Sequence, residues 1–305
     1  MPLCVLTPET MWTEHGHDPD RYVQIGSLTK PLTGTLLSEM VRSGRVGWDD
    51  PVEKWLSTPP GTGITLRHLA LHTSGLPRLP PGTRAVRPNP YESFDAETMR
   101  RAVLDRLPSL VDNPPGAREE YSNLGYAVLG AALEAAGQGT YEELLGVYVL
   151  QPLGVSTGHV IARPPSGDAI LPPRGVWGRS RTAWTMTGPI LPAGGLWATL
   201  RATADVVTGL LVRRTLGAPA PSWTRSGPGY WHNGATGGYS VFAAARDDGR
   251  WVVAHRVGGR ADTVDKIGLR ALASQPLPDA PDEGPAARPD VQGSPASRPH
   301  GSGDR

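Results

Sequence analysis

The chain has 305 residues, of which 38% are hydrophobic and 19% are charged, and this balance is typical of a globular protein with a sizeable core. The formal net charge is +1, and no basic stripe with interleaved aromatic residues occurs, so nothing indicates binding to nucleic acid. The only cysteine is Cys4, which excludes an intramolecular disulfide and a metal cluster held by cysteines.

The first predicted elements are two short strands. They cover residues 3–6 and 11–14 and are joined by a turn at Pro8. Residues 22–25 then lead into the first helix. A hairpin at the start of the chain is therefore expected to supply one edge of a sheet.

The first helix is predicted to begin near Ser27 and to end at Gly44. Pro31 fixes its start, because proline is tolerated only in the first helical turn, where amide donors lack partners anyway. Ser27 and Lys30 are three positions apart on one face, where an amine can take the proton of a hydroxyl. The free N–H groups at a helix start also favour a developing oxyanion. This pair has the chemistry of a nucleophile beside its base, although a Ser-x-x-Lys match alone is weak evidence.

The middle of the chain is predicted to be mainly helical. Apolar spacing and capping residues indicate a short helix through Trp55 and Leu56, a helix capped by Thr65, and helices at 96–107, 125–136, 141–149 and 203–212. Residues 79–90 and 152–181 are predicted to be loops, and 192–196 a glycine turn.

His68 and His72 are four positions apart and suggest a metal site as an alternative. The zinc-protease pattern needs a glutamate directly after the first histidine, but Leu69 stands there and no third ligand is obvious. We therefore interpret both histidines as packing and hydrogen-bonding residues. No metal and no cofactor is expected.

The last part of the chain is rich in strand-forming residues. Strands are predicted at 229–233, 239–245 and 251–257, with a hairpin turn at 247–249, before a final helix at 262–273. Strands at both ends with helices between them predict an α+β fold, in which the two termini share one antiparallel sheet of about five strands, flanked by helices.

We expect one catalytic domain over residues 1–275, followed by a tail. Its α/β part would comprise about 1–50 and 195–275, and a mainly helical lobe would cover about 51–194. Residues 276–305 are mostly Pro, Ala, Gly, Ser, Asp and Arg, a composition that predicts a disordered tail. The sequence shows neither a secretory signal nor a membrane-spanning stretch, so a cytoplasmic protein without membrane association is expected.

Three motifs follow one another along the chain, namely Ser27-Leu28-Thr29-Lys30, Tyr121-Ser122-Asn123 and His232-Asn233-Gly234. Their order resembles the serine β-lactamase-like family, which includes class C β-lactamases, D-alanyl-D-alanine carboxypeptidases, β-lactamase-like esterases and some acyltransferases. Connecting segments match as well, among them Asp49-Asp50-Pro51-Val52, His72-Thr73-Ser74-Gly75-Leu76-Pro77, Pro152-Leu153-Gly154 and Ala193-Gly194-Gly195-Leu196. The resemblance runs from about Leu3 to Ala273 and implies the β-lactamase/transpeptidase-like fold.

The resemblance also implies a role for each motif residue. Ser27 would attack a carbonyl and become acylated, with Lys30 as base if its pKa is depressed and Tyr121 sharing the proton transfer. Asn123 would hold Lys30 and a substrate amide or carbonyl. His232 and Gly234 belong to the third motif, which borders the substrate, and the backbone N–H groups of Ser27 and Ala235 would bind the oxyanion.

The substrate implied is a small ester or amide. Class C β-lactamases carry lysine where this chain has His232, and that lysine helps hold the substrate carboxylate, so efficient β-lactam hydrolysis is not expected. Histidine at this position is the variant of the esterase and peptidase-like members. Two alternatives stay open, namely an acyltransferase of small-molecule biosynthesis and a binding protein that keeps the fold without turnover.

Overall fold

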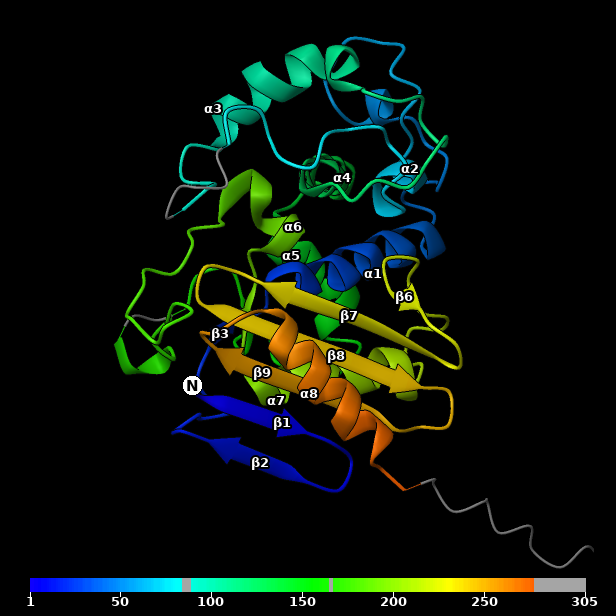
Figure 1. The fold of residues 1–305 in the computed structure, drawn as a ribbon. Coiled ribbons are helices and arrows are strands. Elements are labelled where there is room, and N and C mark those ends of the chain that lie inside the picture. Colours follow the sequence, from blue (N-terminus) through cyan, green and yellow to red (C-terminus); the bar gives the residue numbers. More distant parts are fainter. Residues whose placement is uncertain (84–88, 165–166, 277–305) are drawn as a thin grey trace, which may run out of the picture.

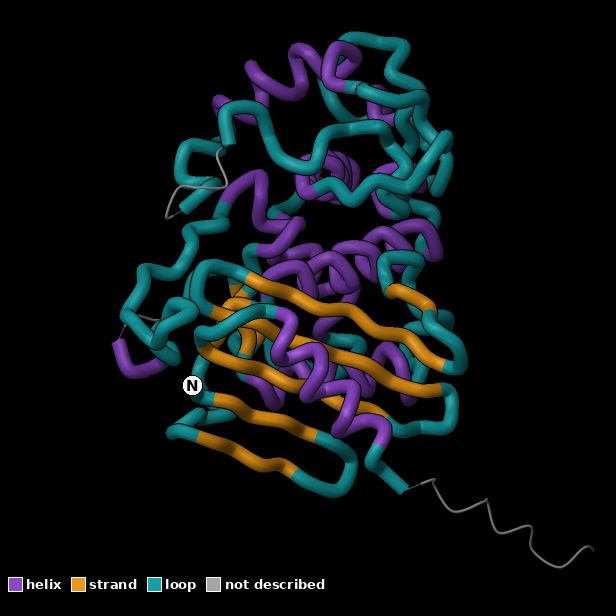
Figure 2. The backbone as a smooth tube through the Cα atoms, viewed as in Figure 1, coloured by secondary structure: helices purple, strands orange, loops and turns teal. Residues whose placement is uncertain are grey.

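The computed structural model describes residues 1–83, 89–164 and 167–276. Its centre is an antiparallel sheet of six strands in the order β2-β1-β9-β8-β7-β6, with a mainly helical part next to β7 (Figure 1). Figure 2 shows the same arrangement, with strands gathered in one part and helices on both sides of the sheet. The expected α+β fold with the two termini in one sheet is confirmed.

The strands of the main sheet come from the two ends of the chain. They are β1 (Leu3–Leu6), β2 (Met11–Glu14), β6 (Thr224–Arg225), β7 (Gly229–Ala235), β8 (Tyr239–Arg246) and β9 (Trp251–Val257). β1 pairs with β9 in the register Leu3 to Arg256. The sequence predicted about five strands, and the sixth, β6, is a two-residue edge strand too short to show an alternating pattern.

Both faces of the sheet are covered. One face packs against α8 (Asp262–Ala273) in a cluster that includes Val5, Phe242, Val252 and Val264. The other face joins the main core together with α1. Because both faces of the sheet are buried, the sequence of β8 is a nearly continuous apolar run and does not alternate between apolar and polar residues.

The structure also contains a three-stranded sheet that was not predicted from the sequence. It pairs β3 (Val23–Gln24) and β4 (Val160–Ile161) with the central β5 (Trp197–Ala198). The segment 152–181 is therefore not entirely loop, because it contributes β4. Strands of two residues carry no periodic signal, and their pairing depends only on the tertiary structure.

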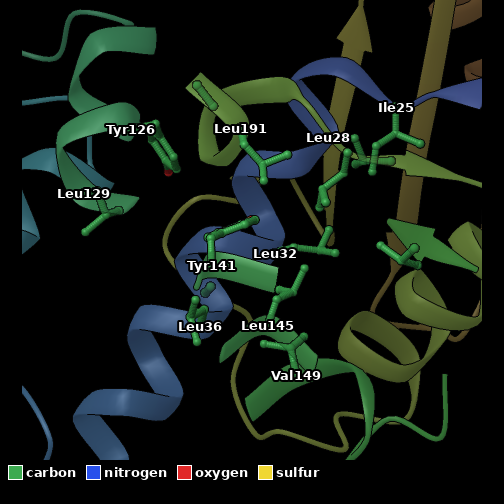
Figure 3. Packing of buried hydrophobic residues seen from close by; sticks show 14 of the residues in the cluster. Ile25, Leu28, Leu32, Leu36, Tyr126, Leu129, Tyr141, Leu145, Val149 and Leu191 are labelled. Carbon is green, nitrogen blue, oxygen red and sulfur yellow. The ribbon is translucent and has the colours of Figure 1, made fainter. Parts of the chain in front are cut away.

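The helix after β3 is largely buried. Gly26–Leu28 form one 3₁₀ turn, and α1 follows as Thr29–Arg42, with eleven of its residues buried. Figure 3 shows apolar side chains of α1 among those of Tyr141, Leu145 and Val149. The burial of α1 fixes the position of whatever its first turn carries.

Several of the remaining helices are shorter or less regular than predicted, whereas α4 is longer. They are α2 (Leu66–Ala70), α3 (Ala96–Thr98), α4 (Asn123–Gly137), α5 (Tyr141–Leu145), α6 (Leu191–Gly194) and α7 (Leu200–Val207). Three continue as π turns, at Met99–Val103, Gly146–Leu150 and Thr208–Val212, and further 3₁₀ turns lie at Val52–Lys54, Leu104–Leu110, Gly167–Ala169 and Gly188–Ile190.

Three predictions about helical segments need correction. The segment predicted as a helix at 96–107 changes from α to π to 3₁₀ geometry, and Pro108, which cannot donate a backbone hydrogen bond, lies within the last part. The predicted glycine turn at 192–196 is largely a helical turn, α6. Helix α4 also begins two residues before the prediction, because the Ser122 hydroxyl accepts from the Gly125 amide and caps it.

The predicted division into two lobes and a tail stays a prediction. The segment from residue 277 onward lies outside the described residues. Within the described ranges, no helix combines the length and the apolar composition needed to cross a bilayer.

Candidate active site

A cleft of about 420 Å³ lies where the 3₁₀ turn before α1, the start of α4 and strand β7 meet. Ser27, Tyr121, Asn123, His232, Gly234 and Ala235 all line it. Lys30 lies directly beneath, fully buried in the first turn of α1. The structure thus brings together all seven residues that the sequence singled out.

Ser27 is held in the 3₁₀ turn, two residues before the first residue of α1. Its Oγ lies 2.6 Å from the Tyr121 hydroxyl and 3.4 Å from Lys30 Nζ. Gly26 before it has φ of +53°, a left-handed conformation that glycine adopts at little cost. The chain therefore turns sharply into the helix and presents the hydroxyl to the cleft.

Lys30 has no exposed surface and donates hydrogen bonds to two carbonyl oxygens. These are Asn123 Oδ1 at 2.8 Å and the Ala193 backbone oxygen at 2.5 Å. Burial, with a smaller contribution from the positive charge of Arg78, lowers the pKa of Lys30 well below its ordinary value. Burial therefore favours the uncharged form of the amine.

Tyr121 lies between the Ser27 hydroxyl and three nitrogen-bearing side chains. Lys30 Nζ is 4.6 Å and Arg78 Cζ is 4.8 Å from the centre of its ring, and the His72 ring centre is 4.7 Å away. Burial raises the pKa of Tyr121, while the hydrogen bond from Ser27 and the charge of Arg78 oppose that shift. The phenol is thus neutral near pH 7 and can both donate and accept.

Both the oxygen and the nitrogen of the Asn123 side-chain amide form hydrogen bonds, which fix the side chain. Its oxygen accepts from Lys30, and its Nδ2 donates to the Tyr91 hydroxyl at 2.8 Å. Its backbone N–H donates to the Arg78 carbonyl oxygen at 2.9 Å. Tyr91 was missed by the sequence analysis, since it lies next to a Pro- and Arg-rich segment without periodic signal.

Strand β7 approaches the 3₁₀ turn closely because it carries glycine at position 234. A Cβ atom there would lie 2.0 Å from the Ile25 carbonyl oxygen and 2.9 Å from the Ser27 amide nitrogen. Likewise, a Cβ on Gly26 would lie 2.8 Å from the Ala235 nitrogen. Two glycines thus let the backbone of Ser27 and that of Ala235 border the same point of the cleft.

The close approach at Gly234 gives a first prediction. Gly234→Ala is expected to push β7 away from the 3₁₀ turn. It should destabilise the protein by ~1–3 kcal/mol and lower the rate of nitrophenyl ester hydrolysis about 100-fold, because ~1 Å misplacement has such effects. Thermal unfolding and nitrophenyl ester hydrolysis measure both. The matched control is Gly158→Ala, whose Cβ would lie 3.6 Å from its nearest neighbour. Equal behaviour of the two variants would contradict the packing argument.

His232 is buried on β7 with its Nδ1 at 2.6 Å from the Asn233 carbonyl oxygen. Burial and the nearby Lys30 lower the pKa of His232 to about 4. The histidine of the third motif is therefore neutral at pH 7. Its neighbour Asn233, not selected from the sequence, lines the cleft as well and donates to Asp265 Oδ2 of α8 at 2.8 Å.

A ring nitrogen of His68 and one of His72 each accept a hydrogen bond from a backbone amide. His68 Nδ1 accepts from the Thr65 amide at 3.3 Å, and His72 Nδ1 accepts from the Ser122 amide at 3.1 Å. Among the residues that the structure describes, no group of three potential metal ligands occurs. His72 also accepts from the Glu120 amide through its carbonyl oxygen at 2.7 Å, so it holds both neighbours of Tyr121.

We predict that activity needs no metal ion. Dialysis against a strong chelator should leave nitrophenyl ester hydrolysis unchanged, because both imidazole Nδ1 atoms are engaged with backbone amides. Inactivation by the chelator, reversed by added zinc, would contradict this expectation.

Comparisons with known proteins bear on the family and the fold. The family model described as Beta-lactamase matches residues 8–292. The D-alanyl-D-alanine-carboxypeptidase/endopeptidase AmpH of Escherichia coli (strain K12) is 35% identical over 142 residues, which cover 45% of this chain and 36% of that protein. The esterase EstB of Burkholderia gladioli is 33% identical over 165 residues, covering 48% and 40%. The chain thus aligns with little more than a third of the length of these curated relatives.

Solved structures share the fold at low identity. A beta-lactamase/D-alanine carboxypeptidase from Yersinia pestis superposes with a TM-score of 0.70 at 22% identity, covering 89% of this chain and 92% of that one. A class C beta-lactamase superposes with a TM-score of 0.72 at 15% identity, covering 90% of each chain. At such identities the likeness concerns the fold alone.

Proposed function

Since this chain belongs to the beta-lactamase family, we propose that it is a serine hydrolase that cleaves a small ester or amide through an acyl-enzyme on Ser27. The observation that carries the proposal is the contact of one hydroxyl with both a phenol and a buried amine, at 2.6 and 3.4 Å. Relatives named as a carboxypeptidase and an esterase support amides and esters as the substrate class.

The hydrogen bonds of Lys30 support its role as the base. An uncharged amine has two hydrogens and one lone pair, and the carbonyl oxygens of Asn123 and Ala193 accept the two hydrogens. The lone pair is then left for the proton of Ser27. We infer that Ser27 attacks the substrate carbonyl as its proton passes toward Lys30, directly or through the Tyr121 hydroxyl.

Tyr121 would carry the proton in the second half of acylation. Its hydroxyl is the group nearest to Ser27 Oγ, so it can donate to the leaving alcohol or amine as the tetrahedral intermediate collapses. The negative oxygen of that intermediate would be bound by the backbone N–H groups of Ser27 and Ala235, which the glycines of the turn and strand bring close. Deacylation would repeat these steps in reverse with water.

The test follows the acyl-enzyme directly. With excess 4-nitrophenyl acetate, we expect a burst of one nitrophenolate per active site and an added acetyl mass on the peptide that contains Ser27. Steady hydrolysis without a burst and without an acetyl group on Ser27 would refute the mechanism, as would an acetyl group found on another residue instead. Adding an amine or alcohol distinguishes the alternative, since an acyltransferase would transfer most of the acyl group to that acceptor instead of water.

A further inference from the structure

Arg78 carries a positive charge at the wall of the cleft. It follows α2 in the helical part of the fold, is exposed, and lines the same cleft as Ser27. Its backbone is anchored, because the Arg78 carbonyl oxygen accepts a hydrogen bond from the backbone N–H of Asn123. Its guanidinium lies 4.8 Å from the centre of the Tyr121 ring. The charge is therefore held next to the phenol that contacts the nucleophile.

This guanidinium has no carboxylate partner among the described residues. The ion pairs found there engage many of the other arginines, such as Arg67 with Asp49 and Arg201 with Asp20. Arg78 takes part in none of them and makes no side-chain hydrogen bond within the described ranges. Its five N–H donors thus have no side-chain or backbone acceptor among the described residues.

Among the described residues that line the cleft, Arg78 is the one cation, because the pKa of His232 is about 4 and its ring is uncharged at pH 7. Lys30 lies beneath the cleft without exposed surface, and burial lowers its pKa. The cleft has one carboxylate in these ranges, Asp265, which lies on α8 and accepts from Asn233. Since α8 covers the sheet whereas Arg78 belongs to the helical part, the two charges come from different walls (Figure 1).

We propose that Arg78 binds a carboxylate of the substrate, so that the preferred ester or amide is an anionic one with its carboxylate toward the helical part. This rests on the proposed function. A guanidinium fork matches a carboxylate with two parallel hydrogen bonds, which gives geometric specificity as well as attraction. Tyr91 and Trp184, edge to face at 6.1 Å and also lining the cleft, offer an apolar surface for the carbon chain between the carboxylate and the reacting carbonyl.

The kinetic test uses two substrates that differ in one charge. They are the mono-4-nitrophenyl ester of glutaric acid and the same compound with its free carboxylate capped as a methyl ester. Wild type is expected to prefer the charged ester, and Arg78→Gln to lower the ratio of kcat/KM values (charged over capped) about tenfold, mainly through KM, since a charged hydrogen bond is lost. Arg78→Lys should retain part of the preference. Arg163→Gln, an exposed arginine outside the cleft, should keep the wild-type ratio.

A binding measurement separates this inference from the proposed function. Glutarate itself should inhibit the wild type and bind the Ser27→Ala variant in calorimetry, and Arg78→Gln should weaken that binding about tenfold in either background. If the ratio and glutarate binding are unchanged by Arg78→Gln, the inference is wrong even when Ser27 still becomes acylated. Equal losses on both esters with a shifted pH profile would also overturn it, because Arg78 would then act through Tyr121. If Ser27 is never acylated but glutarate binding depends on Arg78, the proposed function alone fails.

Discussion

Ser27→Ala is expected to abolish acylation and to lower kcat/KM for nitrophenyl esters by at least about 1,000-fold, because the nucleophile is removed while the rest of the site remains. A fluorophosphonate should add one mass increment to the wild type and none to this variant. The fold should be unaffected, since the Ser27 hydroxyl bonds to Tyr121 and Lys30 at the edge of the cleft, and Lys30 keeps its hydrogen bonds to two carbonyl oxygens.

Ser38→Ala serves as the matched control on the same helix. Its hydroxyl donates to the Gly34 carbonyl oxygen one turn earlier and does not line the cleft. Labelling and hydrolysis should match the wild type. If Ser27→Ala is still labelled at the wild-type rate, another residue is the nucleophile and the proposed mechanism is wrong.

Lys30→Met is expected to lower the acylation rate by about 100- to 10,000-fold, the usual range for loss of a general base. Methionine fills a similar volume but cannot accept a proton. In the wild type, activity should rise as pH rises through the lowered pKa of Lys30 and then reach a plateau, because only the uncharged amine can act as base. Lys30→Arg, whose guanidinium stays charged, should be inactive across that range. A burst rate unchanged in Lys30→Met would remove the residue from the mechanism.

The same variant also tests the charge state of Lys30 through stability. In the unfolded chain the amine has its ordinary pKa of about 10.4, whereas folding lowers it. Between the two values the unfolded state binds a proton that the folded state does not, so wild-type stability falls as pH falls from about 10. Lys30→Met lacks this proton. Its Tm minus that of the wild type should therefore increase as pH falls, and a constant difference would mean that Lys30 is charged in the folded protein.

Local sequence features explain why the first helix and the C-terminal strands could be predicted. Pro31 restricts where a helix can begin, and the apolar spacing after it marks a buried helix, so Ser27 and Lys30 could be placed one turn apart. The β7–β8–β9 strands were predicted from β-branched and aromatic runs and the Asp-Asp-Gly turn. For Tyr121, Asn123 and His232, the signal was the order of motifs in a known family.

Elements of two or three residues could not be predicted in this way. β3, β4, β5 and β6 have two residues each, and such strands are stabilised by their partners instead of by their own sequence. A helix was predicted at 96–107, but its irregular geometry was not, because that geometry follows the packing of the segment and the proline within it.

The sequence by itself determined the family and the α+β class and predicted a set of residues for the site, because these depend on residue type, spacing and order. Only the tertiary structure decided that the lysine is buried with its amine donating to two carbonyl oxygens, and that Tyr91, Arg78 and Asp265 border the same cleft. Burial and long-range contacts set pKa values and the placement of charge, and these arise between segments far apart in the chain. They therefore leave no pattern in any single stretch of sequence.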